Sequence, residues 1–187
     1  MARWRPDSRE RLQAAAMELY ATEGFTATTA AAIAERAGLS ESTFFRHFAD
    51  KREALFGGEQ ALRDELAAAA RAAAEGDSYA AVVAALNAVT SRLQPRRDEL
   101  RRRGAIVVLH PELQERELIK LASWSDALEE ALRERGEPSS RLIADVAVAV
   151  LNASAQQWLE GTSEATLADV VRDNLAVAST LLGASES

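Results

Sequence analysis

The chain contains no cysteine, which excludes disulfide bonds, thiolate catalysis and cysteine-ligated metals. Proline is scarce, with four residues in 187, and glycine is limited to nine. Both residues interrupt helices, so their scarcity in a chain rich in alanine, leucine, glutamate and arginine favours an all-helical fold. The sequence has no alternating strand pattern and no internal repeat, which agrees with that fold class.

Long apolar runs and recognisable catalytic motifs are also missing. The apolar runs are too short to span a bilayer and the N-terminus lacks the apolar core of a signal peptide, so we expect a soluble cytoplasmic protein. There are only two histidines and no phosphate-binding glycine loop, nucleophile elbow or HExxH spacing. We therefore expect no enzymatic activity, no metal and no cofactor.

The net charge of −7 argues at first against a nucleic-acid partner, but its distribution changes that reading. Residues 1–52 hold eight Lys or Arg against seven Asp or Glu, whereas residues 53–187 hold fourteen against twenty-two. The acidity belongs to the second part of the chain, and a DNA-binding surface needs only a local basic face.

Capping residues and breaks predict about nine helices. A first helix begins after Asp7 and stops near Gly24, and three more run over about 29–37, 40–48 and 51–75. Gly or Pro breaks then separate helices near 78–93, 96–109, 112–135, 139–160 and 165–182. We expect a three-helix domain at 1–52 and a larger helical bundle at 53–187.

The segment 29–56 has the pattern of a helix-turn-helix, which places one helix in the major groove of DNA. Phe44 and Phe48 share one helix face and predict a small core with Ile33, Ala37 and Leu39, while Gly38 suits the turn. The remaining polar and aromatic side chains are candidates for DNA contact, although a solvated helix face is the simpler alternative. These candidates are Thr29, Ser40, Glu41, Ser42, Thr43, Phe45, Arg46, His47 and Lys51.

The run TAAAIAERAGLSESTFFRHFADKREAL at 29–55 resembles the N-terminal domain of the TetR family of transcriptional regulators. The resemblance covers about residues 8–56. It implies a homodimer that binds a palindromic operator, usually represses, and is released by a small ligand. The family most often has tyrosine where this chain has Phe45, so a phosphate hydrogen bond is lost there. Arg3, Trp4 and Arg5 form either a basic arm or a disordered terminus.

The last two predicted helices carry apolar residues over much of their surface, which favours a subunit interface in a four-helix bundle. An ordinary intrachain core is the alternative. Homodimerisation through these helices is also what the family resemblance implies. A helical protein-interaction module without specific DNA binding is the rival function, because the same apolar helices would serve it.

An effector pocket is expected among the helices from 53 to 160, lined mostly by apolar residues. The candidate wall residues, each of which could instead be core, are Arg103, His110, Leu121, Trp124, Leu128, Asn152, Gln156 and Trp158. The stretch 101–160 is loosely similar to a C-terminal type associated with acyl-CoA-like ligands, which implies an acyl-CoA or fatty-acid-like effector. Arg101, Arg102 and Arg103 would meet its phosphates, or else form a solvated face.

Gly57 and Gly58 fall inside the predicted 51–75 helix, where each glycine costs about 1 kcal/mol relative to alanine. We expect either a soft point between the DNA-binding and ligand-binding parts or a tolerant site. If the first holds, replacing both by alanine raises stability and weakens ligand-induced release.

Overall fold

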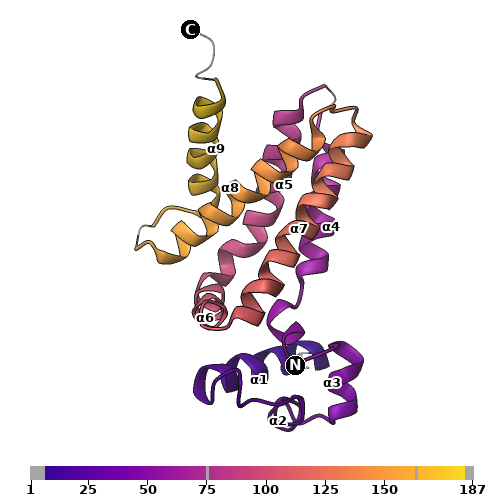
Figure 1. The fold of residues 1–187 in the computed structure, drawn as a ribbon, viewed down its shortest axis with the longest axis vertical. Helices are drawn as coiled ribbons and strands as arrows, with labels where there is room; N and C mark the ends of the chain where they lie inside the picture. The colour runs from indigo at the N-terminus through magenta and orange to yellow at the C-terminus, as the bar shows by residue number, and fades with distance from the viewer. Residues whose placement is uncertain (1–6, 75, 163, 184–187) are drawn as a thin grey trace, which may run out of the picture. The chain divides into compact units, whose positions relative to one another are not determined.

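The computed structural model of this chain describes residues 7–74, 76–162 and 164–183, and within these residues all regular secondary structure is helical (Figure 1). The predicted fold class is therefore confirmed. The chain divides into two compact units, one formed by Met1–Gly58 with Arg102–Arg116 and the other by Glu59–Arg101 with Glu117–Ser187. The proposed basic arm at Arg3, Trp4 and Arg5 lies outside the described residues.

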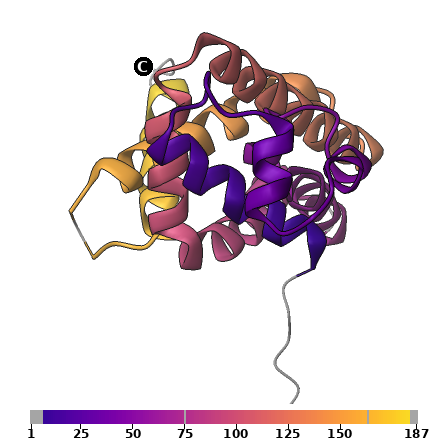
Figure 2. The same cartoon turned by 90° about the horizontal axis from the view of Figure 1, so that it is seen from below.

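The first unit contains α1 (Ser8–Thr22), α2 (Ala30–Arg36), α3 (Glu41–His47) and the short 3-10 helix η1 (Glu53–Phe56). The three α-helices are labelled in Figure 1 and have the indigo to purple colours of the first residues in Figure 2. It also includes the end of α6 (Arg97–Val107) and the start of α7 (Pro111–Glu134). Apolar side chains from all of these segments form one core. The DNA-binding candidates and residues 102–116 therefore share a folded unit.

The prediction of one helix over 51–75 is wrong, because Gly57 and Gly58 form a turn that interrupts it. The 3-10 helix η1 ends at Phe56 and α4 begins at Glu59. Gly57 is extended, with φ −65° and ψ 139°, and Gly58 has φ +87°, a conformation that other residues rarely adopt. A Cβ atom at Gly57 would also collide with the side-chain amide of Gln13. Alanine at Gly58 would strain the turn, and alanine at Gly57 would require the Gln13 side chain to move, so we expect a loss of stability where the sequence suggested a gain.

The second unit contains α4 (Glu59–Ala72), α5 (Ser78–Leu93), η2 (Gln94–Arg96), α8 (Ser140–Glu160) and α9 (Leu167–Gly183), together with the remaining parts of α6 and α7. Asp77 caps α5 by accepting a hydrogen bond from the Ala80 amide at 2.9 Å. The core of this unit combines leucine and valine with many alanines, which lets the helices approach closely. Trp124 and Trp158 are its largest side chains.

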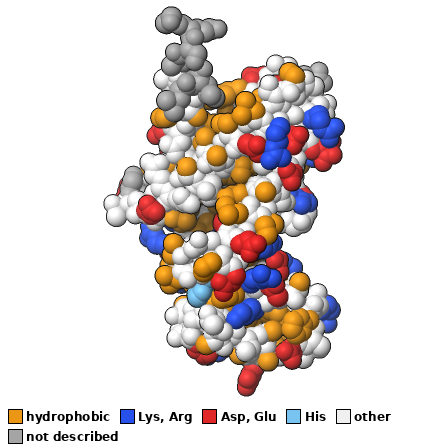
Figure 3. All heavy atoms as spheres, viewed as in Figure 1, with side chains coloured by type: hydrophobic (Ala, Val, Ile, Leu, Met, Phe, Trp, Pro, Cys, Tyr) orange, Lys and Arg blue, Asp and Glu red, His pale blue; other side chains and the backbone are white. Residues whose placement is uncertain are grey.

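By length and composition α8 could cross a membrane, and no other helix of the described residues could. One such helix is weak evidence, since core helices of soluble proteins pass the same test. Its inner face packs in the core through Ala144, Val148 and Leu151. Only 33% of its most apolar window is buried within the chain. The space-filling view shows hydrophobic side chains at several places on this face of the molecule, among uncharged and charged groups (Figure 3).

Polar side chains join α7 to α8 at the surface of the second unit. Ser125 donates a hydrogen bond to Asp145, and the Arg141 guanidinium contacts Asp145 at 2.8 Å and Asp126 at 2.9 Å. The hydrogen bond from Ser125, followed by that from Arg141, holds the pKa of the Asp145 carboxyl below its ordinary value. With a further contact between Arg141 and Glu129 at 3.4 Å, this network ties α8 to α7.

Candidate nucleic-acid interface and effector site

Side-chain caps and a tight turn fix the angle between α2 and α3. Thr29 caps α2 by accepting a hydrogen bond from the Ala32 amide at 3.1 Å, and Ser40 caps α3 by accepting one from the Thr43 amide at 3.2 Å. Gly38 between them has φ +65°, as the turn requires. The sequence-based prediction of a helix-turn-helix is confirmed in its caps, its turn and its bounds.

The predicted core beneath α3 is present. Phe44 is fully buried and Phe48 nearly so, with their ring centroids 5.4 Å apart. Ile33 is fully buried, Ala37 is buried, and Leu39 packs against the same cluster. Because the two phenylalanines lie one turn apart on one face, their burial turns the opposite face of α3 outward.

The outward face of α3 presents Glu41, Ser42, Phe45 and Arg46, all exposed. Phe45 is 54% exposed, and its ring meets the buried Phe44 ring edge-on at 5.4 Å, which limits its motion. This set combines a carboxylate, a hydroxyl, an aromatic ring and a guanidinium. Such groups supply the hydrogen bonds and apolar contacts by which proteins read base edges and grip phosphates.

The other DNA-binding candidates lie around this face. The hydroxyls of Ser42 and Thr43 each lie 2.9 Å from that of Ser40, and Thr29 is exposed at the start of α2. His47 is half-buried, and its Nε2 atom has no hydrogen-bond partner among the described residues. Contact with DNA stays a prediction for all of these residues.

Lys51 has a structural role that the sequence did not indicate. Its Nζ donates to the carbonyls of Phe25 at 2.7 Å, Thr28 at 2.9 Å and Thr26 at 3.2 Å, and lies 4.4 Å from the centre of the Phe25 ring. These bonds hold the loop that leads into α2. The Tyr20 hydroxyl donates to the Lys51 carbonyl at 2.5 Å, and burial, with the charge of Asp50, raises the pKa of Tyr20. A DNA contact by Lys51 would have to share its ammonium with this loop.

Two arginines of α1 donate to carbonyls at the C-terminal ends of α2 and α3. Neither is among the sequence-based candidates. Arg11 donates to the carbonyl of Ala37 at 2.5 Å, where α2 ends. Arg9 donates to the carbonyl of His47 at 3.4 Å, where α3 ends, and its guanidinium lies 4.9 Å from the centre of the Phe48 ring. Cations favour the carbonyl ends of helices. The signal available in the sequence is two arginines, Arg9 and Arg11, shortly before Leu12, the first buried residue of α1.

The predicted effector residues are distributed over both units. Arg103 and His110 belong to the first unit, whereas Leu121, Trp124 and the others belong to the second. The Nε of Arg103 donates to the Leu55 carbonyl at 3.0 Å and its guanidinium lies 4.4 Å from the centre of the Phe56 ring. The His110 ring packs at 5.1 Å against the ring of Phe25. Both residues are therefore part of the unit that carries α3.

The remaining effector candidates are spread over the second unit. Trp124, Leu128 and Trp158 are buried in its core, and Leu121 packs against that core. Asn152 is half-buried and Gln156 is exposed. Contact of these residues with an effector stays a prediction.

Arginines of α6 donate to backbone carbonyls of different segments, and contact of Arg101, Arg102 and Arg103 with effector phosphates stays a prediction. Arg101 donates to the carbonyl of Leu159 at 2.8 Å and Arg97 to that of Trp158 at 2.5 Å, so both satisfy the C-terminal carbonyls of α8. Arg103, two residues after Arg101, belongs to the other unit. Arg101 therefore bonds to the end of α8, whereas Arg103 bonds to η1.

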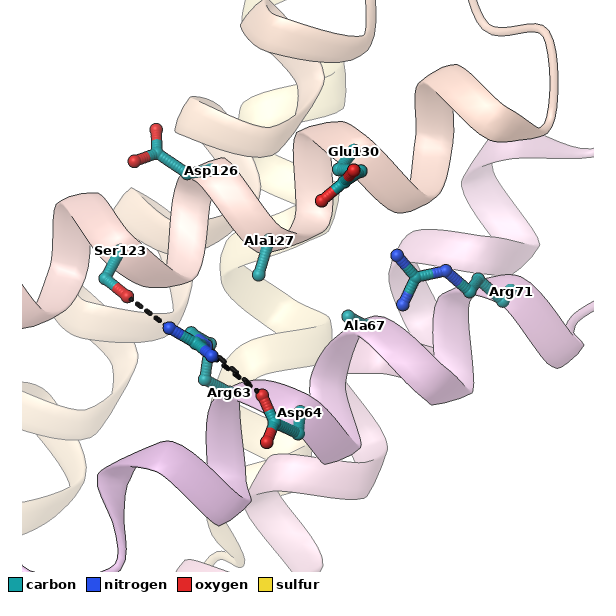
Figure 4. Close-up of a pocket in the computed structure, with 8 residues that line it drawn as sticks. All are labelled: Arg63, Asp64, Ala67, Arg71, Ser123, Asp126, Ala127 and Glu130. Carbon is teal, nitrogen blue, oxygen red and sulfur yellow. Dashed lines mark hydrogen bonds and ion pairs between the residues drawn. The ribbon is translucent and has the colours of Figure 1, made fainter.

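Two cavities among the described residues of the second unit are open to the surface. A groove of about 420 Å³ lies between α4 and α7 (Figure 4) and is lined by Arg63, Asp64, Ala67, Arg71, Ser123, Asp126, Ala127 and Glu130. In it Arg63 bridges the two helices, donating to Ser123 at 3.3 Å and to Asp64 at 3.0 Å. A cavity of about 240 Å³ lies between the C-terminal end of α8 and the N-terminal part of α9, and the predicted effector residue Trp158 lines it.

Comparisons with known proteins agree with this geometry. The family model of the bacterial regulatory proteins of the tetR family matches residues 12–56, and the model of the MftR C-terminal domain matches residues 77–182. The first covers the helix-turn-helix and its support in α1 and η1. The second covers more than half of the chain. No curated protein matches the sequence significantly.

Solved structures show the same fold over nearly the whole chain. FadR of Thermus thermophilus, a TetR family repressor solved with lauroyl-CoA, is 26% identical, with a TM-score of 0.61 over 96% of this chain and 95% of that one. FadR of Bacillus halodurans is 17% identical, with a TM-score of 0.67 over 98% and 99%. SmeT, solved with triclosan, is 23% identical, with a TM-score of 0.57 over 95% and 91%.

The two family models together account for the helix-turn-helix unit and most of the helical bundle, and the whole-chain structural matches support both. This chain belongs to the TetR family of bacterial transcriptional regulators.

Proposed function

We propose that this protein is a cytoplasmic homodimeric repressor that binds a palindromic operator and is released by a small apolar or amphipathic effector. The outward face of α3, with Glu41, Ser42, Phe45 and Arg46 exposed above a rigid core, is the observation that carries the proposal. In this proposal residues 1–52 bind DNA, and residues 53–187 bind the effector and the second subunit. The TetR family, to which this chain belongs, consists of transcriptional regulators, and this argues against an enzymatic function.

A homodimer is supported by the apolar surface that α8 and α9 leave uncovered. Leu142 on α8 is 66% exposed and Val177 on α9 is 58% exposed. Val146, Ala149 and Ala153 continue the stripe on α8 at helical spacing. A second copy that packed its own α8 and α9 there would remove this surface from water and place two copies of α3 on one DNA duplex.

An acyl-CoA or fatty-acid-like effector is supported by the relationship to Thermus thermophilus FadR, whose structure holds lauroyl-CoA. The core around Trp124 and Leu128 is closely packed, so an acyl chain would have to separate the helices that enclose it. Ligand binding and helix movement are therefore one event in this proposal, which is what release from DNA requires.

Purified protein mixed with the DNA beside its own gene tests the proposal. Binding should be sequence-specific, should weaken steeply as salt increases because phosphate contacts release counterions, and should be reversed by lauroyl-CoA. Arg46→Gln should weaken binding, whereas the control Arg133→Gln removes an exposed charge from α7 and should not. If the protein shows no sequence preference even at low salt, it is a helical protein-interaction module instead.

A further inference from the structure

Glu41 is an unusual residue for a surface that approaches DNA. Its side chain is exposed in the first turn of α3, and no ion pair or hydrogen bond engages its carboxylate in the described part of the chain. The phosphates of DNA repel such a charge unless it finds a hydrogen-bond donor. If α3 lies against DNA, the Glu41 carboxylate therefore requires a hydrogen-bond donor on the DNA, because the described residues supply none.

The major groove offers that donor only at certain positions. Cytosine presents its N4 amino group and adenine its N6 amino group, whereas guanine and thymine present the acceptors O6 and O4. The amino group of adenine lies beside the acceptor N7, which also repels a carboxylate. The amino group of cytosine lies beside the nonpolar C5 edge, so cytosine is the base that a carboxylate accepts best.

Phe45 strengthens the choice of cytosine. It lies four residues after Glu41, so the two side chains share a face of α3. The Phe45 ring is 54% exposed and is held edge-on against Phe44, with the ring planes at 86°. An aromatic ring beside the carboxylate matches the nonpolar C5 edge of a pyrimidine and offers nothing to the N7 acceptor of a purine.

We propose that Glu41 determines operator specificity by accepting a hydrogen bond from the N4 amino group of one cytosine in each half-site. This inference rests on the proposed function, since it requires α3 to lie in the major groove. Glu41 then acts in two ways. It favours cytosine at one position, and it lowers affinity for all DNA that has no cytosine there.

Selection from random DNA followed by sequencing tests the base preference. The wild type should enrich a palindrome with one fixed cytosine in each half-site. Glu41→Gln should change that base to adenine, because an amide pairs with N6 and N7 together, and Glu41→Ala should lose preference at that position alone. The control Glu35→Gln removes the same charge from an exposed site on α2 and should keep the wild-type pattern.

Affinities for single sites make the test quantitative. Replacing the cytosine by thymine should weaken wild-type binding by about 5- to 150-fold, and binding by Glu41→Ala by less than about 2-fold. Glu41→Ala should also bind unrelated DNA roughly 2- to 5-fold more tightly, because a screened repulsion is gone. Thermal melting of each variant establishes that it is folded.

Two results separate a failure of the proposed function from a failure of the assignment to Glu41. If the wild type enriches no sequence, the proposed function itself is wrong. If the wild type enriches a palindrome and Glu41→Ala enriches the same one with the same cytosine, only the assignment to Glu41 is overturned. A purely structural role for Glu41 in α3 would give that second result, because it would alter melting without altering base preference.

Discussion

Phe44 and Phe45 are adjacent in sequence but should respond oppositely to replacement by alanine. Phe44 is fully buried among the side chains that support α3, so Phe44→Ala leaves a cavity and should cost about 3–5 kcal/mol. Phe45 is 54% exposed, so Phe45→Ala should cost less than about 1 kcal/mol. A domain of this size is stable by only about 5–15 kcal/mol, so the first change consumes a large part of its stability.

Thermal melting followed by circular dichroism, together with operator binding, separates the two variants. For a chain of this size each kcal/mol shifts the midpoint by about 2–4 °C, so Phe44→Ala should melt at least about 6 °C lower and bind DNA poorly for that reason. Phe45→Ala should melt within a few degrees of the wild type and still lose DNA affinity. If Phe44→Ala melts like the wild type, or Phe45→Ala is the less stable protein, the assignment of the two faces of α3 is refuted.

Three further changes test other parts of the structure. Gly58→Ala should destabilise by about 1–2 kcal/mol in denaturant unfolding, because its φ of +87° strains a side chain, whereas Gly104→Ala, in open space on α6, should stabilise by up to about 1 kcal/mol. A loss of stability in both would contradict this view of the turn. The folded-state pKa of Asp145 lies below its unfolded value of about 3.9, so its stabilisation is complete above that pH and disappears as the pH falls through the folded pKa. The melting temperatures of the wild type and Asp145→Asn should therefore differ at pH 6 or so and converge in strong acid, and a difference that grew with acidity would have the wrong sign. Leu142→Asp on α8 should convert a dimer into monomers in sedimentation analysis. Leu118→Asp on α7 changes an equally exposed leucine and should leave the dimer intact. Equal dissociation by both variants would argue against an interface on α8.

Local signals made the helix-turn-helix predictable from sequence. The caps at Thr29 and Ser40, the turn at Gly38 and the spacing of Phe44 and Phe48 each depend on neighbours within a few residues. The resemblance to the TetR family rested on the same residues. The bounds of α5 to α9 are also close to prediction, because Gly, Pro and capping residues mark them directly.

Long-range packing explains what the sequence could not predict. Nothing near His110 indicates that its ring packs against Phe25, eighty-five positions earlier. The ammonium of Lys51 likewise looks free in the sequence, although it bonds three carbonyls between residues 25 and 28. The break at Gly57 and Gly58 was missed for a different reason. A capping pattern at residues 50–53 suggested one long helix, and the backbone freedom of two glycines outweighed it.

The first unit is built from two stretches of chain with residues 59–101 between them. Ile106, Val107 and Leu113, from the second stretch, complete the core that lies beneath α1 and α3. When only the first stretch has left the ribosome, α3 is therefore complete but the apolar core beneath it lacks these three side chains. During synthesis the DNA-binding unit reaches its final stability only when the start of α7 has emerged, after α4 and α5 are already outside the exit tunnel.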